Sequence, residues 1–201
     1  MRLDFYSFAH AIRDKFPGLW TAANKINEQL FLLRYGRKLR NAIQSIENRH
    51  TKNRYKYANV ENIDAMVAFF QKPPADSFKY FKPHAFDRES IKSLISNRSF
   101  LAFVIWDDNA IVGYFFLRSF FMGKAYLGKM VDADYCGKGL GKEMCLVAMD
   151  LASMLRLQMY ETISKGNLSS LYSTQKVLDV KIIKELPNNY LYIEDFHKRT
   201  M

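Results

Sequence analysis

The stretch that decides the fold reads Val131-Asp-Ala-Asp-Tyr-Cys-Gly-Lys-Gly-Leu-Gly-Lys142. It follows an extended apolar run, Tyr126–Val131, and precedes a segment whose apolar residues recur at helical spacing. We therefore predict a glycine-rich turn between a strand and a helix. Glycines let main-chain amides approach a phosphate closely, and a helix N-terminus attracts negative charge. Because Lys138 and Lys142 add positive charge, the turn is predicted to bind a phosphate-bearing ligand.

Two common phosphate-binding motifs do not fit this turn. A P-loop requires a glycine five residues before Gly141 and a Ser or Thr after Lys142, where this chain has Cys136 and Glu143. The dinucleotide-binding pattern requires a third glycine at the position of Lys142, and it normally lies near the start of its domain. Neither ATP-type nor NAD-type binding is therefore expected.

The remaining pattern resembles motif A of the GNAT superfamily, Arg/Gln-x-x-Gly-x-Gly/Ala, which here reads Cys136-Gly-Lys-Gly139-Leu-Gly141. Both glycines match, and Cys136 replaces the usual Arg or Gln. The resemblance implies an acyl-CoA-dependent N-acyltransferase that holds the coenzyme pyrophosphate mainly through backbone amides. The residues it assigns to the coenzyme are Met130, Val131, Cys136, Gly137, Lys138, Gly139, Leu140, Gly141, Lys142 and Asn167.

The resemblance covers roughly residues 54–197, and we predict an acyltransferase domain at 54–201 after a basic helical extension at 1–53. The expected fold class is α+β, with α/β/α layers, a mixed, mostly antiparallel central sheet and the helical N-terminal extension. The predicted strands are 55–60, 100–106, 110–116, 124–131, 157–163, 180–186 and 189–196. The predicted helices begin near residues 61, 87, 140 and 167.

Two residues are candidates for the chemistry of acyl transfer. In the superfamily an Asn opens the helix after the motif A unit, with a Tyr about five residues later, which matches Asn167 and Tyr172. Tyr172 would then protonate the departing thiolate as a general acid. The attacking amine must be neutral, and we expect Glu161, on the neighbouring strand, to accept its proton, with Asp132 and His84 as the alternative acceptors. Backbone amides near Met130 would polarise the carbonyl as an oxyanion hole.

The acceptor is less defined than the donor. His84, Arg118 and Asp132 are candidates for substrate binding because they are expected near the acceptor side of the sheet. Acetyl-CoA is the default donor, other short acyl groups stay open, and the amine is expected to attack the thioester directly. An amino sugar of surface polysaccharide synthesis is one acceptor hypothesis. The alternatives are a protein or peptide N-acetyltransferase and a non-catalytic CoA-binding sensor or scaffold.

Composition agrees with a globular protein of 201 residues, 49% of them hydrophobic and 15% aromatic. The two cysteines, Cys136 and Cys145, are close in sequence, so we expect no structural disulfide and a cytoplasmic location. The four histidines are scattered, and no metal site is expected. No nucleic-acid-binding motif accompanies the formal charge of +10, so no nucleic-acid partner is expected. Monomer and homodimer both stay open.

The extension has two interpretations. Up to Arg54 the chain carries eleven basic and four acidic residues, and six apolar residues recur at helical spacing: Ile26, Leu30, Leu33, Leu39, Ile43 and Ile46. An amphipathic helix of this kind could contact an anionic membrane surface. The second interpretation, which we favour from the sequence, is that these apolar residues pack on the core and leave a solvated basic face.

Overall fold

A computed structural model describes residues 17–49, 53–73, 78, 80–81 and 83–198. The helices are α2 (Pro17–Glu47), α3 (Ile63–Gln71), α4 (Arg88–Ser96), α5 (Leu140–Met154) and α6 (Leu168–Val177). The strands are β1 (Arg54–Tyr57), β2 (Phe100–Asp107), β3 (Ala110–Phe120), β4 (Lys124–Val131), β5 (Gln158–Ser164), β6 (Leu178–Leu186) and β7 (Tyr190–His197). Three short 3-10 turns are η1 (Val60–Asn62), η3 (Ala133–Tyr135) and η4 (Pro187–Asn189).

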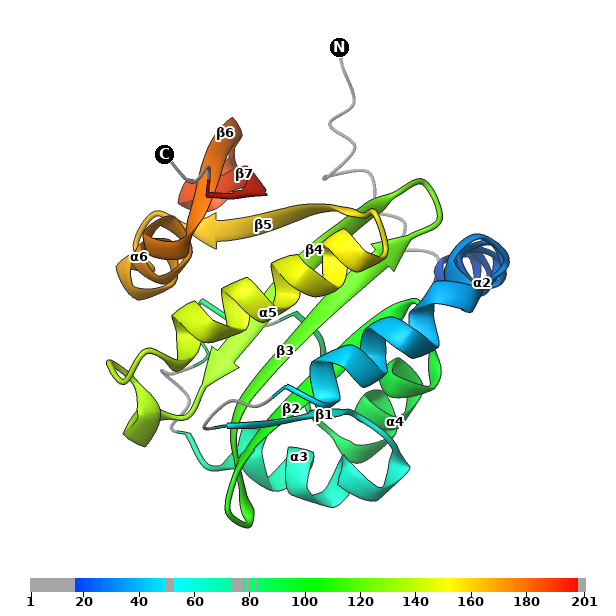
Figure 1. The fold of residues 1–201 in the computed structure, drawn as a ribbon, viewed down its shortest axis with the longest axis horizontal. Helices are drawn as coiled ribbons and strands as arrows, with labels where there is room; N and C mark the ends of the chain where they lie inside the picture. The colour runs from blue at the N-terminus through cyan, green and yellow to red at the C-terminus, as the bar shows by residue number, and fades with distance from the viewer. Residues whose placement is uncertain (1–16, 50–52, 74–77, 79, 82, 199–201) are drawn as a thin grey trace.

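The strands form one seven-stranded sheet in the order β1-β2-β3-β4-β5-β7-β6. Five of its six pairings are antiparallel, and only β4 and β5 are parallel, joined by the crossover helix α5. This confirms the predicted α+β class and mixed, mostly antiparallel sheet. Figure 1 shows α5 lying along β4 between the two halves of the sheet.

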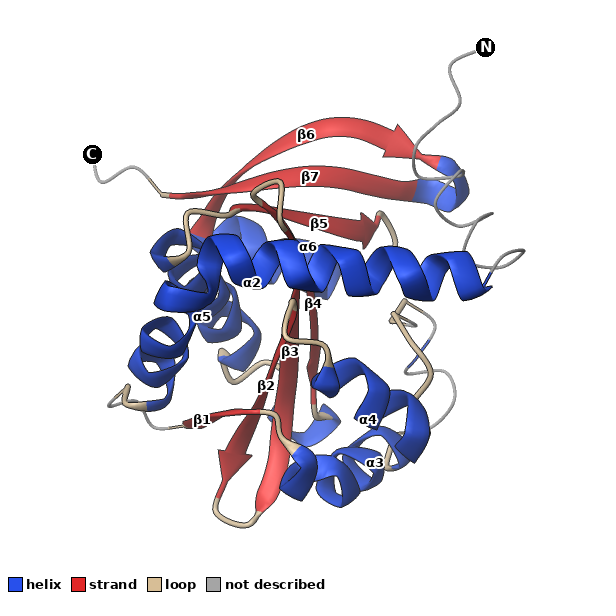
Figure 2. Ribbon diagram, turned by 90° about the vertical axis from the view of Figure 1, so that its right-hand side faces the viewer, coloured by secondary structure: helices blue, strands red, loops and turns tan. Residues whose placement is uncertain are grey.

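Two apolar layers hold the helices on opposite faces. One contains α2 and α5 side chains packed on β2–β5, and the other contains α3 and α4 packed on β2–β4. In Figure 2 the strands β2 to β4 are seen edge-on, with α5 on the left and α3 and α4 on the right. No described helix is long and apolar enough to cross a membrane.

The local signals explain most element ends. Asp87 caps α4 by accepting a hydrogen bond from the Ser90 amide at 2.9 Å, and Asn167 caps α6 through the Ser170 amide at 3.1 Å. The second hairpin strand is four residues longer than predicted, because Ser119 and Phe120 still pair with β4. The first strand is shorter than predicted and ends at Tyr57, before the capping turn at Asn59.

The extension differs from its prediction in one respect. Its described part, residues 17–49, contains one long helix, α2, whose buried side chains are Phe31, Tyr35, Leu39, Ala42 and Ile46. The predicted packing of Ile26, Leu30 and Leu33 is wrong, because all three side chains are exposed. Leu39 and Ile46 are buried as predicted, and Ile43 is half-buried. The proposed boundary at residue 53 adjoins residues 50–52, which lie outside the described part, and it stays a prediction.

Candidate active site

The central feature of the site is a split between the two parallel strands. β4 and β5 pair only from Lys124 to Leu127 on one side and from Gln158 to Glu161 on the other. Beyond these residues β4 stays paired with β3 alone as far as Val131, and β5 stays paired with β7. The strands thus open into a V, and main-chain groups that face the gap have no partner strand.

A cleft of about 400 Å³ occupies the open end of this V. Its walls come from both strands, from the glycine turn and from α6. Eight of the ten residues predicted to bind the coenzyme line it: Met130, Val131, Cys136, Gly137, Gly139, Gly141, Lys142 and Asn167. The other two do not: Leu140 is buried under Gly113, and the Lys138 ammonium lies 4.9 Å from the centre of the Tyr135 ring.

The glycine turn has the backbone geometry that its residues require. Gly137 and Gly139 have φ angles of 78° and 91°, in the left-handed region that residues with a Cβ rarely adopt. Gly139 is the N-cap of α5, and the amides of Lys142 and Glu143 bond its carbonyl oxygen. The first-turn amides of Leu140 and Gly141 precede these bonds and are available to an anion. Gly141 has ordinary φ and faces the cleft.

Asp132 holds the start of the turn. Its carboxylate is buried, accepts a hydrogen bond from the Asp134 amide at 2.9 Å, and pairs with the Lys72 ammonium at 2.8 Å. The Asp132 amide bonds the Val112 carbonyl oxygen on β3. Both carboxylate oxygens therefore have protein partners, and the structure gives Asp132 a role in fixing the loop. This differs from the predicted role in acceptor binding.

Tyr172 lies on α6 at the edge of the cleft. Its side chain is 58% exposed, and the Lys142 ammonium lies 5.0 Å from the centre of its ring. Asn167 opens the same helix, and the capping bond to Ser170 fixes the direction in which α6 leaves β5. The structure thus brings Tyr172, Asn167 and Lys142 together on one wall of the cleft. The catalytic role of Tyr172 stays a prediction.

Glu161 borders the cleft but is bound on the buried side of the sheet. Its carboxylate pairs with the Lys129 ammonium at 2.9 Å and accepts a hydrogen bond from the Thr174 hydroxyl at 3.0 Å. Lys129 also lies 2.9 Å from the Thr174 hydroxyl oxygen. Burial favours the neutral amine, but the adjacent Glu161 charge raises the pKa of Lys129 above its usual value. The expected free base is therefore one half of a buried ion pair.

Asp195 on β7 adds a second carboxylate to this buried cluster. Both of its oxygens lack a hydrogen-bond partner, and the side chain is 1% exposed. Burial, reinforced by the negative charge of Glu161, raises the pKa of Asp195 to about 8. A protonated Asp195 leaves Lys129 and Glu161 as a neutral pair.

His84 lies in an aromatic cluster on the α3–α4 face. Its Nδ1 donates to the Ala85 carbonyl oxygen at 2.8 Å, which leaves Nε2 to accept from the Tyr114 hydroxyl at 3.1 Å. Burial lowers the pKa of His84 and favours the neutral ring. Phe70 and Phe86 contact the ring edge-to-face. His84 does not line the cleft, so its predicted contact with the acceptor has no support in this arrangement.

Arg118 is also away from the cleft. Its guanidinium lies 4.9 Å from the centre of the Trp20 ring and donates to the Asn24 side-chain oxygen at 3.0 Å. Both partners belong to α2, so Arg118 joins the extension to β3. The predicted role in acceptor binding is not supported. The aromatic residues that line the cleft include Tyr80 and Phe81, in addition to Tyr135 and Tyr172.

The folds of solved structures identify the architecture. The GNAT domain of S. lividans PAT matches with a TM-score of 0.62 and 10% identity, covering 72% of this chain and 90% of that domain. PaiA N-acetyltransferase from Thermoplasma acidophilum, solved with coenzyme A, matches with a TM-score of 0.59 and 12% identity over 73% of this chain and 100% of that one. The chain has the GNAT fold. A third match is AAC(6')-Ib, solved with an aminoglycoside and acetyl-CoA, with a TM-score of 0.58 and 11% identity over 74% and 94% of the two chains.

Neither a protein-family model nor a curated protein sequence matches this chain. The assignment to the GNAT fold therefore rests on structural similarity and on the glycine motif. Sequence identities of 10–12% show the fold alone. Among the residues with described positions, no group of three or more His, Cys, Asp or Glu is placed to hold a metal.

Sequence reasoning missed four residues of this GNAT-fold site. Lys129, Thr174 and Asp195 form the buried cluster around Glu161, and Gly128 lies in the wall of the cleft. A side chain on Gly128 would meet the Phe116 ring at 2.4 Å, so this glycine allows β3 and β4 to pack closely. The sequence signal for this cluster was Lys129, which lies within the mostly apolar strand β4. A lysine that is buried in such a strand requires an acidic partner.

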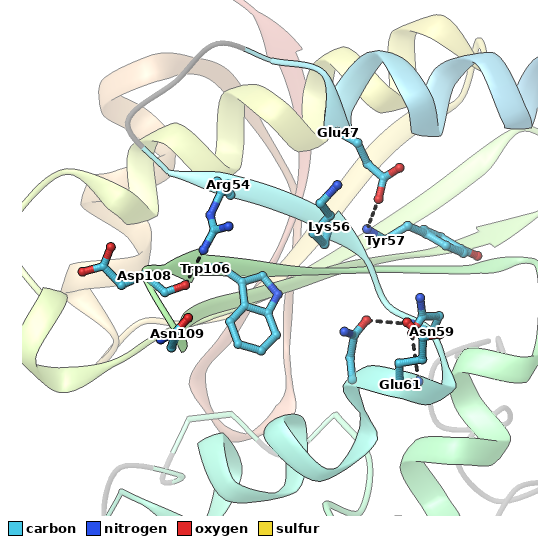
Figure 3. A pocket seen from close by; sticks show the side chains of 10 residues that line it. Glu47, Arg54, Lys56, Tyr57, Asn59, Glu61, Trp106, Asp108 and Asn109 are labelled. Atoms are coloured by element: carbon cyan, nitrogen blue, oxygen red, sulfur yellow. Dashed lines mark hydrogen bonds between the residues drawn. The ribbon is translucent and has the colours of Figure 1, made fainter.

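A second cavity, of about 500 Å³, lies at the β1 edge of the sheet and is shown in Figure 3. Its polar lining includes Glu47, Lys56 and Asn59, beside the ring of Trp106. The Glu47 carboxylate in this cavity already has a protein partner, because it accepts a hydrogen bond from the Tyr57 amide at 3.0 Å. The glycine turn and the open strands belong to the other cleft, which is the candidate active site.

Proposed function

We propose that this protein is an acyl-CoA-dependent N-acyltransferase with acetyl-CoA as its donor. The observation that carries the proposal is the cleft between β4 and β5, which ends at the glycine turn that begins α5. A strand pair that opens at a helix N-terminus suits an extended ligand with a pyrophosphate at one end. The proposal is further supported by solved structures of this fold, three of which contain coenzyme A or acetyl-CoA.

In this proposal the amides of Leu140 and Gly141 hold the pyrophosphate, and the acyl-bearing arm follows the gap between the strands. Main-chain N–H groups of β4 near Met130 that face the gap polarise the thioester carbonyl. The amine attacks the carbonyl carbon, the carbon–sulfur bond breaks, and Tyr172 donates a proton to the leaving sulfur. No covalent enzyme intermediate is needed, and Cys136 has no role as a nucleophile.

The proton of the amine leaves through water in this scheme. We do not retain Glu161 as its first acceptor, because its carboxylate is paired with Lys129 and bonded by Thr174. The neutral fraction of the amine then reacts, and the rate rises with pH until the amine itself is deprotonated. Within this class, the favoured acceptor is a small primary amine, and an amino sugar is the first candidate because Tyr80 and Phe81 offer aromatic faces.

The experiment is a comparison of Gly141→Asp with Gly141→Ala. A Cβ at Gly141 would meet Ser173 at 3.5 Å, an ordinary contact, so both variants should fold. Coenzyme A should raise the Tm of the wild type and of Gly141→Ala. At a ligand concentration of a hundred times the Kd, the free energy of unfolding should increase by roughly 2.7 kcal/mol. Gly141→Asp should lose this protection because its carboxylate repels the pyrophosphate. Equal protection of all three proteins would overturn the site assignment.

A second candidate function is a CoA-binding module without catalysis. It is favoured by one observation, the engagement of Glu161 by Lys129, which leaves that carboxylate tied to a buried partner. Release of coenzyme A from acetyl-CoA, measured with a panel of amino sugars, simple amines and lysine peptides, separates the two candidates. Turnover with any amine supports the enzyme and its acceptor class; protection by coenzyme A without turnover supports the binding module.

A further inference from the structure

Helix α2 has an exposed apolar stripe in addition to its buried one. The side chains of Leu19, Ile26, Leu30 and Leu33 are 58%, 61%, 38% and 86% exposed. Their spacing of seven, four and three residues places them on one face of the helix. Aliphatic side chains exposed singly are ordinary, but four in a line along one helix form an apolar strip about 20 Å long.

The exposed stripe is opposite the face that holds α2 on the protein. That inner face consists of Phe31, Tyr35, Leu39 and Ile46, which pack against α5 and the sheet. At 100° of rotation per residue, Leu33 and Tyr35 are about 200° apart around the helix axis. The stripe therefore points away from the core. α2 lies across the outside of the molecule in Figure 2.

The charges around the stripe all have one sign. Lys25, Arg34, Arg37, Lys38 and Arg40 are exposed on α2. The two acidic residues of the helix face the protein: Glu28 accepts a hydrogen bond from the Arg98 amide at 2.7 Å, and Glu47 accepts one from the Tyr57 amide at 3.0 Å. The outer surface of α2 thus combines apolar and cationic side chains.

A neighbouring turn enlarges this surface. The β3–β4 turn is fixed to α2 by the Phe121 amide, which donates to Asn27 at 3.1 Å, and by Arg34, which donates to the Phe121 carbonyl oxygen at 2.8 Å. The side chains of Phe121 and Met122 are 37% and 65% exposed. The apolar surface therefore continues from the helix onto the loop beside it.

We propose that this surface, made of α2 and the β3–β4 turn, binds anionic lipid. Aliphatic side chains would enter the headgroup boundary, and the long Lys and Arg side chains beside them would reach the phosphates. A second copy of the chain fits less well, because a two-fold contact through this face would bring cations against cations, and both carboxylates in the described part of α2 face the protein. The proposal is independent of the acyltransferase function.

The test is co-sedimentation of the full-length protein with vesicles of phosphatidylcholine, with and without phosphatidylglycerol. Binding is expected only to the anionic vesicles, and it should fall between low and physiological salt because surface charge is screened. Leu33→Gln and Arg37→Glu should each weaken binding by roughly tenfold. The matched controls are Ile182→Gln and Lys181→Glu, exposed changes of the same chemistry on β6, which should bind like the wild type.

Three outcomes would overturn the proposal. One is a wild type that does not sediment with anionic vesicles at low salt. Another is equal binding by Leu33→Gln and Ile182→Gln. Vesicle binding would then depend on charge alone, and the apolar stripe would have no part in it. The third is a wild type that sediments as a dimer in analytical ultracentrifugation while Leu33→Gln is a monomer, which would assign the stripe to self-association. Circular dichroism of every variant would check that it is folded.

Discussion

At the scale of single residues, the cluster under the cleft is the most unusual feature of the molecule. It places two carboxylates, Glu161 and Asp195, near one ammonium, Lys129, in a buried layer. The Glu161 carboxylate pairs with the ammonium and accepts a hydrogen bond from the Thr174 hydroxyl, whereas the Asp195 carboxylate accepts none. The two acids therefore share one counter-charge unequally, and protonation of Asp195 is the way in which the cluster becomes neutral.

Asp195 should make the protein less stable as pH rises. Its pKa is about 8 in the folded protein and near 3.8 when exposed, so between these values the folded state binds the extra proton. The contribution of Asp195 to the free energy of unfolding is then highest below pH 4. It decreases between pH 4 and pH 8, by at most about 1.4 kcal/mol per pH unit. Thermal unfolding of Asp195→Asn should lack this decline. Asp108→Asn, on an exposed turn, should keep it; parallel curves for all three proteins would contradict the assigned protonation.

Tyr172 should act on the rate more than on binding. Tyr172→Phe keeps the ring beside Lys142 and removes only the hydroxyl, so we expect kcat to fall by roughly tenfold or more while KM for acetyl-CoA changes little. Steady-state kinetics with an active amine measure this split. Tyr80→Phe, in the same cleft, is the control for loss of a phenol. A Tyr172→Phe variant with wild-type kcat would leave Tyr172 with a packing role.

The residue scale is also where sequence reasoning was weakest. The glycines and the Asn167 cap act through their own backbone, so their neighbours in the chain suffice to predict them. Glu161 depends on Lys129 and Thr174, which are 32 and 13 residues away in the chain. Such a pairing is decided by which side chains share one face of the sheet, and spacing along the chain does not contain it.

At the scale of elements, α2 shows why a helix can be predicted correctly and oriented wrongly. Its apolar residues form two stripes on opposite sides, so the periodicity indicates a helix without selecting the buried face. The strands had no such ambiguity. The predicted range of β4 agrees with the structure at both ends, because a glycine turn follows it and a short turn precedes it.

The two stripes of α2 should respond differently to the same truncation. Leu39→Ala removes a side chain that is 2% exposed and packed in the main core, so we expect a loss of roughly 2–5 kcal/mol in the free energy of unfolding. Leu33→Ala removes a side chain that is 86% exposed and should change stability by about 0.5 kcal/mol or less. Urea unfolding measures both. Similar losses would mean that the outer stripe is covered in solution.

At the scale of the whole molecule, α2 and the sheet share one apolar core. The inner face of the helix belongs to the same apolar cluster as β2, β3 and α5. Asn27 bonds to β3 and to the turn after it, and Arg34 and Glu28 bond to loops of the sheet. The predicted division at residue 53 stays a prediction, and because of these contacts we expect no separate folding of the two parts.

The two tryptophans allow the unfolding of the extension and of the sheet to be followed separately. Trp20 lies on α2 and Trp106 on β2, so Trp20→Phe and Trp106→Phe leave one fluorescent reporter in each part. Denaturation followed by fluorescence should give the same midpoint as circular dichroism within each variant, because unfolding is expected to be all-or-none. A Trp20 signal that changes at lower denaturant than the circular dichroism of the same variant would show that the extension unfolds first.

The opening between β4 and β5 has one more consequence, for the hydrogen-bonding groups along the edge of β4. Past Leu127, β4 keeps a neighbour on one side only, so every second residue there directs its amide and carbonyl into the cleft. These groups suit a ligand that has the hydrogen-bonding pattern of a peptide. The pantetheine arm of coenzyme A carries two amide groups, so the donor would serve as a short substitute strand. Its binding would complete the sheet that the polypeptide leaves open.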